Sequence, residues 1–193
     1  YALGVVIGAP ILVALSAKFP AKNILIAFMV LFTFFNFLSA IAPNYTTLLI
    51  SRFFSGLPHG AFFCFGTVVA AKLAQKGKSA QAIAVMFTGL TIANVAMVPL
   101  TTYLGHTFSW RYAFAIVSII GLITIFSLYK NLPKQKEVKT VTLKEELEFF
   151  KTIKAWHILA IVATGFGGLF AWISYIAPLL IHVTNFAESS VSY

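Results

Sequence analysis

The chain has 193 residues, of which 60% are hydrophobic and 10% are charged, and it carries a net charge of +9. Its mean hydropathy of +0.91 lies far outside the range of soluble domains and leaves a polytopic membrane protein as the class that fits. A bilayer core about 30 Å thick needs roughly 20 apolar residues for each helical crossing. The apolar stretches therefore predict an all-α membrane helix bundle with about six spans, at 1–15, 24–41, 45–69, 82–104, 112–128 and 156–183.

The sequence gives little support for catalysis. It contains no aspartate, and four of its five glutamates lie in one loop. The single cysteine, Cys64, falls inside the third span, where neither a disulfide nor a CxxC site can form. We therefore expect a protein that is not an enzyme and that holds no cofactor or metal. Tyr1 already stands inside an apolar run with no signal segment before it, so we also expect an internal fragment of a longer protein.

The lysine and arginine residues predict the orientation in the membrane, because they are retained on the cytoplasmic side. They lie between the first and second spans, between the third and fourth, and, as seven lysines, between residues 130 and 154. The alternate connections at 42–44, 105–110 and 184–187 contain neither residue and are predicted to face outward. This topology, together with anionic lipid, explains the positive charge, so no nucleic-acid partner is expected.

The hydrophilic stretch 129–155 is predicted to be a cytoplasmic linker between two helical bundles. Within it, Thr142 precedes Glu145 at capping-box spacing, and apolar residues follow at helical intervals. This pattern favours a short amphipathic helix on the cytoplasmic surface. A solvated connector without a regulatory role is the alternative.

The third span carries polar residues that hydropathy does not explain. Counted from Tyr45 at 1.5 Å per residue, Arg52 lies roughly 10 Å inside the membrane and His59 about 10 Å deeper. Their spacing of seven residues places both on one face, which cannot look at lipid. Because no span of this chain offers a carboxylate, we expect backbone, water or a helix outside the chain to satisfy Arg52. For His59, a neutral imidazole bonded to a neighbouring helix and a proton shuttle are both open.

Prolines and glycines in three spans predict bends and close helix contacts. Pro58 removes a backbone hydrogen bond and is expected to bend the third span, whereas Gly56 and Gly60 favour close packing over a ligand role. The fourth span has the same character, with positions for kinking or gating at Gly89 and Pro99.

Two further positions are candidates for the transport pathway or its wall. Asn94 in the fourth span is expected to bond another helix or to line a pathway. In the sixth span a glycine-rich segment precedes Trp172 and Tyr175, which suit a cavity wall, although interfacial aromatic packing explains them equally well.

The first and fourth spans show a faint internal repeat of opposite direction. Pro10 is followed five residues on by Leu15 and twelve on by Lys22, and Pro99 is followed at the same intervals by Leu104 and Arg111. If the match is real, Lys22 and Arg111 anchor the next helix on opposite faces of the membrane. Coincidence is an open alternative, as is an Arg111 side chain that reaches the headgroups beside Trp110.

Together these motifs resemble the major facilitator superfamily, in particular its drug:proton antiporter branch and the predicted arabinose efflux permeases. The similarity runs the whole length of the chain and is carried, in order, by YALGVVIGAP, RFFSGLPHGAFF, FTGLTIANVAMVPL, FSWRYAF and FAWISYIAP. The resemblance implies helices two to seven of twelve. Residues 1–128 would then be most of the N-terminal half without its first helix, 129–155 the central cytoplasmic loop, and 156–193 the start of the C-terminal half.

The resemblance also suggests roles for single residues. RFFSGLPHG matches the helix-four motif whose arginine, here Arg52, is implicated in proton coupling. GLTIANVAMVPLTTYLG resembles the antiporter motif of helix five, although threonines stand at 101 and 102 where glycines are common.

The motif of the loop between helices two and three is only partly kept. It retains Lys18 and Lys22, but Ala17 and Pro20 replace its aspartate and glycine, so the charge relay attributed to that aspartate is not carried over. Relatives also tend to place an acidic residue in helix one, which this chain does not include.

We therefore expect a multi-pass protein of the bacterial inner membrane that exports a small solute, such as a sugar or drug, in exchange for protons. Arg52 would stabilise the deprotonated form of a nearby carboxyl, so that protonation and substrate binding compete. The expected partners are membrane lipid, a small-molecule substrate and protons, and the full-length protein is expected to be a monomer. An uptake carrier of the same fold, or a membrane scaffold or receptor that transports nothing, is the alternative.

Overall fold

The computed structural model describes residues 1–16, 18–133, 148 and 151–183. The chain divides into two compact units, Tyr1–Thr140 and Val141–Tyr193, and each is described by itself. Most of the surface helix predicted from Thr142 onward lies outside the described residues, as does the outward connection predicted at 184–187.

The described residues confirm the all-α class. The first unit contains six α-helices and one π-turn: α1 (Ala2–Ser16), α2 (Ala21–Ala40), α3 (Tyr45–Leu73), α4 (Ser79–Ile92), η1 (Ala93–Met97), α5 (Val98–Thr107) and α6 (Trp110–Asn131). The second unit contains α8 (Ile153–His182). Within the described ranges five helical stretches are long and apolar enough to cross a membrane, namely Ala21–Ala40, Tyr45–Leu73, Ser79–Gly105, Trp110–Asn131 and Ile153–Ile176. α1 is apolar but shorter, with 15 residues.

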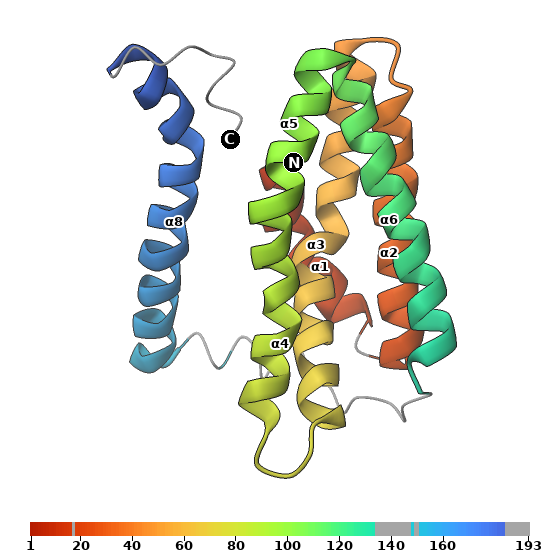
Figure 1. The fold of residues 1–193 in the computed structure, drawn as a ribbon. Helices are drawn as coiled ribbons and strands as arrows, with labels where there is room; N and C mark the ends of the chain where they lie inside the picture. The colour runs from red at the N-terminus through yellow and green to blue at the C-terminus, as the bar shows by residue number, and fades with distance from the viewer. Residues whose placement is uncertain (17, 134–147, 149–150, 184–193) are drawn as a thin grey trace. The chain divides into compact units, whose positions relative to one another are not determined.

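α4, η1 and α5 follow one another in one direction as a single span, and successive spans of the first unit run in opposite directions, with connections that alternate between its two ends (Figure 1). The turn between α3 and α4 reverses at Gly77, whose φ of 83° suits glycine. At the other end Asn44 caps α3 by accepting a hydrogen bond from the Thr47 backbone N–H at 2.8 Å. The turns after α1 and α3, which carry lysines, lie at one end of the first unit, and those after α2 and α5, which carry neither lysine nor arginine, lie at the other, as the charge bias predicts.

Helix α3 lies at the centre of the first unit and packs on α1, α2 and α4. Its half toward Leu73 meets α2 in one apolar cluster, formed by Ala21, Ile24, Leu25, Phe28, Ala61, Phe65 and Val69. Lipid tails are as apolar as these side chains, so close packing rather than expulsion of water stabilises the contact. The half of the same interface toward Tyr45 is polar, with Asn36, Ser39, Ser51 and Ser55 all buried.

Glycines bring α1 and α3 into backbone contact. A Cβ added to Gly8 would overlap the backbone of Leu57, and one added to Gly56 would overlap the carbonyl oxygen of Tyr1. At Gly60 the Cβ would lie 2.7 Å from that of Ala9. The close approach expected at Gly56 and Gly60 is therefore present, and α1 supplies small residues to match it.

We predict that Gly8→Ala destabilises the full-length protein, because the new methyl group meets rigid backbone rather than a flexible side chain. The expected loss in the free energy of unfolding is about 1–3 kcal/mol, measured by thermal unfolding of the purified protein in detergent. Gly105→Ala is the matched control, since its Cβ would meet its nearest atom, the Trp110 Cα, at 3.9 Å. Equal melting temperatures for the two variants would contradict the prediction.

Candidate functional site

Arg52 of α3 is surrounded by groups from α2, from α6 and from Tyr1, the residue just before α1. Its Nη1 donates a hydrogen bond to the Asn36 Oδ1 of α2 at 3.2 Å. Its guanidinium lies over the ring of Tyr1, 4.3 Å from the centroid, and over the ring of Phe114 from α6 at 5.1 Å. Cation–π contacts gain strength where water is excluded, so two rings and an amide hold this charge within the membrane.

Burial and a hydrogen bond to its own helix fix the orientation of the Asn36 side chain. Its side chain is 1% exposed, and its Nδ2 donates to the Phe32 carbonyl oxygen at 2.8 Å. With its nitrogen so occupied, the amide presents its oxygen to Arg52, the one orientation that an arginine can use. One turn further along α2, the hydroxyls of Ser39 and Ser51 lie 2.9 Å apart and continue the polar contact between α2 and α3.

The same Tyr1 that covers Arg52 also binds His59. The Tyr1 hydroxyl lies 2.9 Å from the His59 Nδ1, and the two rings meet edge to face with centroids 5.7 Å apart. A neutral imidazole with its proton on Nε2 accepts from the hydroxyl at Nδ1. A protonated imidazole donates from Nδ1 and the hydroxyl accepts. The pair can therefore take up a proton at His59 without losing its hydrogen bond.

The structure corrects one expectation for Arg52. The expected partner was backbone, water or a helix outside the chain, whereas Asn36, Tyr1 and Phe114 all belong to this chain. The shared face of Arg52 and His59 is present, since both contact Tyr1. An uncharged amide and aromatic faces can also stabilise an arginine, and these were not among the expected partners.

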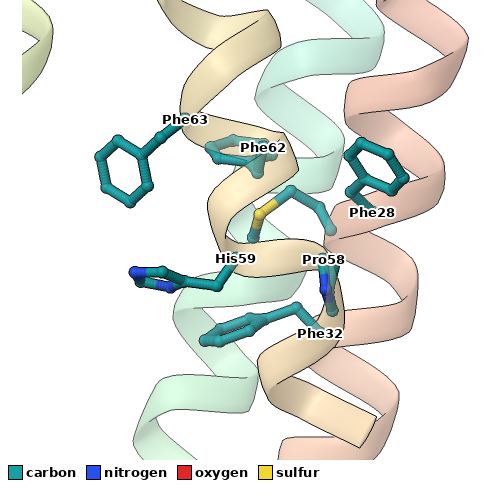
Figure 2. A pocket seen from close by; sticks show the side chains of 7 residues that line it. Phe28, Phe32, Pro58, His59, Phe62 and Phe63 are labelled. Carbon is teal, nitrogen blue, oxygen red and sulfur yellow. The ribbon is translucent and has the colours of Figure 1, made fainter. Parts of the chain in front are cut away.

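A small apolar cavity of about 200 Å³ lies beside His59, between α2 and α3. Figure 2 shows His59 and Phe63 projecting from the same side of α3, with Phe28 and Phe32 coming from α2. Pro58 also lines the cavity, and its side chain is among the fully buried ones. α3 continues through this proline from Tyr45 to Leu73, so any bend at Pro58 does not interrupt the helix.

Lys22 and Arg111 form reciprocal contacts at opposite ends of α2 and α6. Each is the second residue of its helix. The Lys22 Nζ donates to the carbonyl oxygens of Tyr129 at 2.7 Å and Leu132 at 2.5 Å, at the end of α6. The Arg111 Nη2 donates to the carbonyl oxygen of Ala42 at 2.9 Å, just after α2 ends.

These contacts agree with the faint repeat in the sequence. Each cation neutralises the negative end of the antiparallel neighbour, an interaction that contributes roughly 0.3–1 kcal/mol at an exposed helix end. Arg111 also lies 4.4 Å from the ring centroid of Trp110, next to it in the chain. Lys18, the other lysine of the loop motif, is exposed just after α1 ends.

The fourth span breaks its regular winding where the sequence placed its irregular residues. The Val98 N–H donates to the Ala93 carbonyl oxygen five residues earlier, which defines the π-turn η1, and Pro99 follows at the start of α5. Pro99 cannot donate a hydrogen bond and would crowd a regular α-turn, which explains the wider one before it. Asn94 is exposed within this turn and makes no hydrogen bond with the described residues.

The close packing expected at Gly89 is not found in the described part of this chain, where an added Cβ would meet no atom within 4 Å. Trp172 and Tyr175 lie on α8 with 64% and 71% of their surfaces exposed. Both belong to the second unit, so their role in a cavity wall stays a prediction.

Three residues of the cluster around Arg52 were missed by sequence reasoning. Asn36 could have been found, because it is the one asparagine in the apolar run FTFFNFL of the second span. Tyr1 and Phe114 carry no such signal, since aromatic residues are common throughout these helices.

The fold and this intramembrane cluster define a polytopic helical membrane protein with a charged group held inside the bilayer. A family model described as Major Facilitator Superfamily matches residues 1–193, and the chain belongs to that family. It is 41% identical over 185 residues to the inner membrane transport protein YdhP of Escherichia coli (strain K12), which covers 96% of this chain and 48% of that protein.

Two other relatives share this coverage. The protein AraJ of Escherichia coli (strain K12) is 36% identical over 193 residues, or 100% of this chain and 49% of its own length. A "Probable sugar efflux transporter" of Helicobacter pylori (strain J99) is 28% identical over 187 residues, or 97% of this chain and 48% of its own. The chain thus spans about half the length of the curated relatives it matches.

We predict that Asn36→Ala lowers the free energy of unfolding of the full-length protein by about 1–3 kcal/mol, because it leaves the partly buried Arg52 Nη1 without its acceptor. Thermal unfolding in detergent measures the change. Asn131→Ala makes the same chemical change at an exposed position near the end of α6 and should have almost no effect. Equal losses for the two variants would disprove a special role for Asn36.

Proposed function

We propose that the chain forms part of a secondary active transporter of the bacterial inner membrane, which exports a small solute in exchange for protons by alternating access. The observation that carries the proposal is the continuous intramembrane cluster of Asn36, Arg52, Tyr1 and His59. A charge held at such depth is costly and marks a functional site by default. Its neighbour His59 carries an imidazole, a group that can give or take a proton at its ring nitrogens.

The proposed coupling uses the donors that Arg52 still has. A guanidinium carries five N–H groups, and Asn36 accepts from one of them among the described residues. The others can bind an anion such as a carboxylate of the substrate or of a part of the protein beyond this chain. Arg52 would stabilise the deprotonated carboxylate, so that protonation releases it and competes with substrate binding.

His59 and Tyr1 offer a second place for the proton within the chain itself. Their hydrogen bond survives protonation by reversing its direction, so the proton can reside there transiently. Arg52 lies over the same Tyr1 ring, so a positive charge on His59 would be sensed at Arg52 through the shared phenol. Proton binding and the state of Arg52 are therefore linked.

The remaining predicted site residues keep their roles within this proposal. Asn94, exposed in the π-turn, would line the pathway, with Gly89 and Pro99 allowing the fourth span to bend. Pro58 would give α3 similar freedom. Trp172 and Tyr175 would contribute to a cavity wall from the second unit.

The domain assignment also belongs to the proposal. Residues 1–128 would be most of the N-terminal half, 129–155 the central loop and 156–193 the start of the C-terminal half, in accord with a chain that spans about half of its relatives. The printed name of the Helicobacter pylori relative favours a sugar as the solute and efflux as the direction. We expect the full-length transporter to act as a monomer.

We predict that Arg52→Ala abolishes proton-driven transport. The full-length protein in inverted inner-membrane vesicles should accumulate one of a panel of radiolabelled pentoses and hexoses when a pH gradient is imposed. The flux of the variant should be at least about tenfold lower than that of the wild-type protein, a factor that corresponds to about 1.4 kcal/mol. Lys76→Ala, which removes a cation from the cytoplasmic turn after α3, is the control and should transport normally.

Each contrary outcome has a clear meaning. An Arg52→Ala protein that inserts normally and keeps its gradient-driven flux would overturn the proposed coupling. Flux into right-side-out vesicles would indicate an uptake carrier instead. A scaffold or receptor would transport no sugar, and a Phe63→Cys side chain, with Cys64 replaced, would then resist an aqueous thiol reagent because no water reaches that face.

A further inference from the structure

A wide crevice opens between the cytoplasmic ends of α2 and α6. Its volume is about 890 Å³, and it is lined by Pro20, Lys22, Asn23, Ile26, Ala27, Tyr129 and Lys130. It is formed by the start of α2 and the end of α6. Arg52 lies near the opposite end of the helices, close to the start of α3. Neither Asn23 nor Lys130 takes part in the proposed transport mechanism.

The rim of this crevice is suited to an anion. It carries two lysines and an amide, and none of its seven lining residues is acidic. Lys22 uses two hydrogen bonds on the end of α6, which fixes its ammonium group in place and leaves a third N–H. The Lys130 and Asn23 side chains are exposed and line the opening, and neither makes a hydrogen bond with other described residues.

The deeper wall is apolar. Ile26 and Ala27 lie four and five residues beyond Lys22 along α2, which places them about 6–8 Å further into the membrane. Tyr129, 71% exposed, also lines the crevice, and its ring centroid lies 5.6 Å from the Lys22 Nζ. A cationic rim above an apolar wall matches a lipid molecule, whereas a soluble anion would gain nothing from the wall.

A second cytoplasmic crevice, between α3 and α4, lacks this combination. It measures about 390 Å³ and contains one lysine, Lys78, together with Gln75 and Gln81 among apolar residues. Both crevices lie on the lysine-rich side of the membrane. Of the two, the crevice between α2 and α6 is the one that contains two lysines, and hydrogen bonds hold one of them in place. The general positive charge of this side is common to both crevices and does not explain why their linings differ.

We propose that the crevice between α2 and α6 binds the phosphate headgroup of an anionic phospholipid from the cytoplasmic leaflet. The phosphate lies between the ammonium groups of Lys22 and Lys130 and accepts from the Asn23 amide, while an acyl chain follows Ile26 and Ala27. Basic pockets between membrane helices on this side are suited to such headgroups, and each lysine near the surface adds measurably to the attraction. The site is independent of the proposed transport function.

Binding of dansyl-labelled phosphatidylglycerol to the delipidated full-length protein in uncharged detergent tests the proposal. The wild-type protein should bind it more tightly than dansyl-labelled phosphatidylcholine. Lys130→Gln should weaken phosphatidylglycerol binding about fivefold, the factor expected for one surface lysine. Lys76→Gln makes the same charge change on the same side, away from the crevice, and should leave binding unchanged.

Three outcomes would overturn the proposal. Equal loss in Lys130→Gln and Lys76→Gln would mean that only general charge attracts the lipid. Equal affinity for the two lipids would mean that the phosphate is not selected. Displacement of the lipid by millimolar inorganic phosphate would identify a soluble anion as the ligand. Lys130→Gln is the decisive variant because, unlike Lys22, Lys130 holds no helix end together in the described residues.

Discussion

The backbone contact between α1 and α3 determines where Tyr1 lies in the central cluster. Because Gly8 and Gly56 carry no Cβ, the two helices approach until the backbone of one touches the other. This approach places Tyr1 where its ring covers Arg52 and its hydroxyl reaches His59. A wider separation would leave both groups of α3 without their neighbour from α1.

The second contact of α3 divides the bundle into two environments. At the end of α3 toward Leu73, α2 and α3 share an apolar cluster around Phe28 and Phe65. At the end toward Tyr45 they share buried hydroxyls and Asn36. Arg52 lies in the polar half, where a neutral amide and aromatic faces hold it. The groups that contact its guanidinium within the described part of the chain are thus neutral, so they stabilise the charge without cancelling it.

Hydropathy and the helical period were sufficient for the coarse architecture, because the length of a span and the sharing of a face depend on local spacing. They placed Arg52 and His59 together and the irregular winding near Pro99. They did not identify Tyr1 or Phe114, because contacts between residues more than fifty positions apart depend on how helices pack. Asn36 could be predicted from the sequence, but carboxylates, backbone and water were considered as partners of Arg52 and a side-chain amide was not.

The reciprocal contacts of Lys22 and Arg111 have a mechanical consequence. Each cation binds the far end of the other's helix, so a lengthwise slide of α6 along α2 would break the bonds at both ends of the pair at once. Rotation of the two helices together would break neither. These contacts therefore oppose sliding of α6 along α2 but not tilting of the two helices together. If the first unit rocks, α2 and α6 are expected to move as a pair.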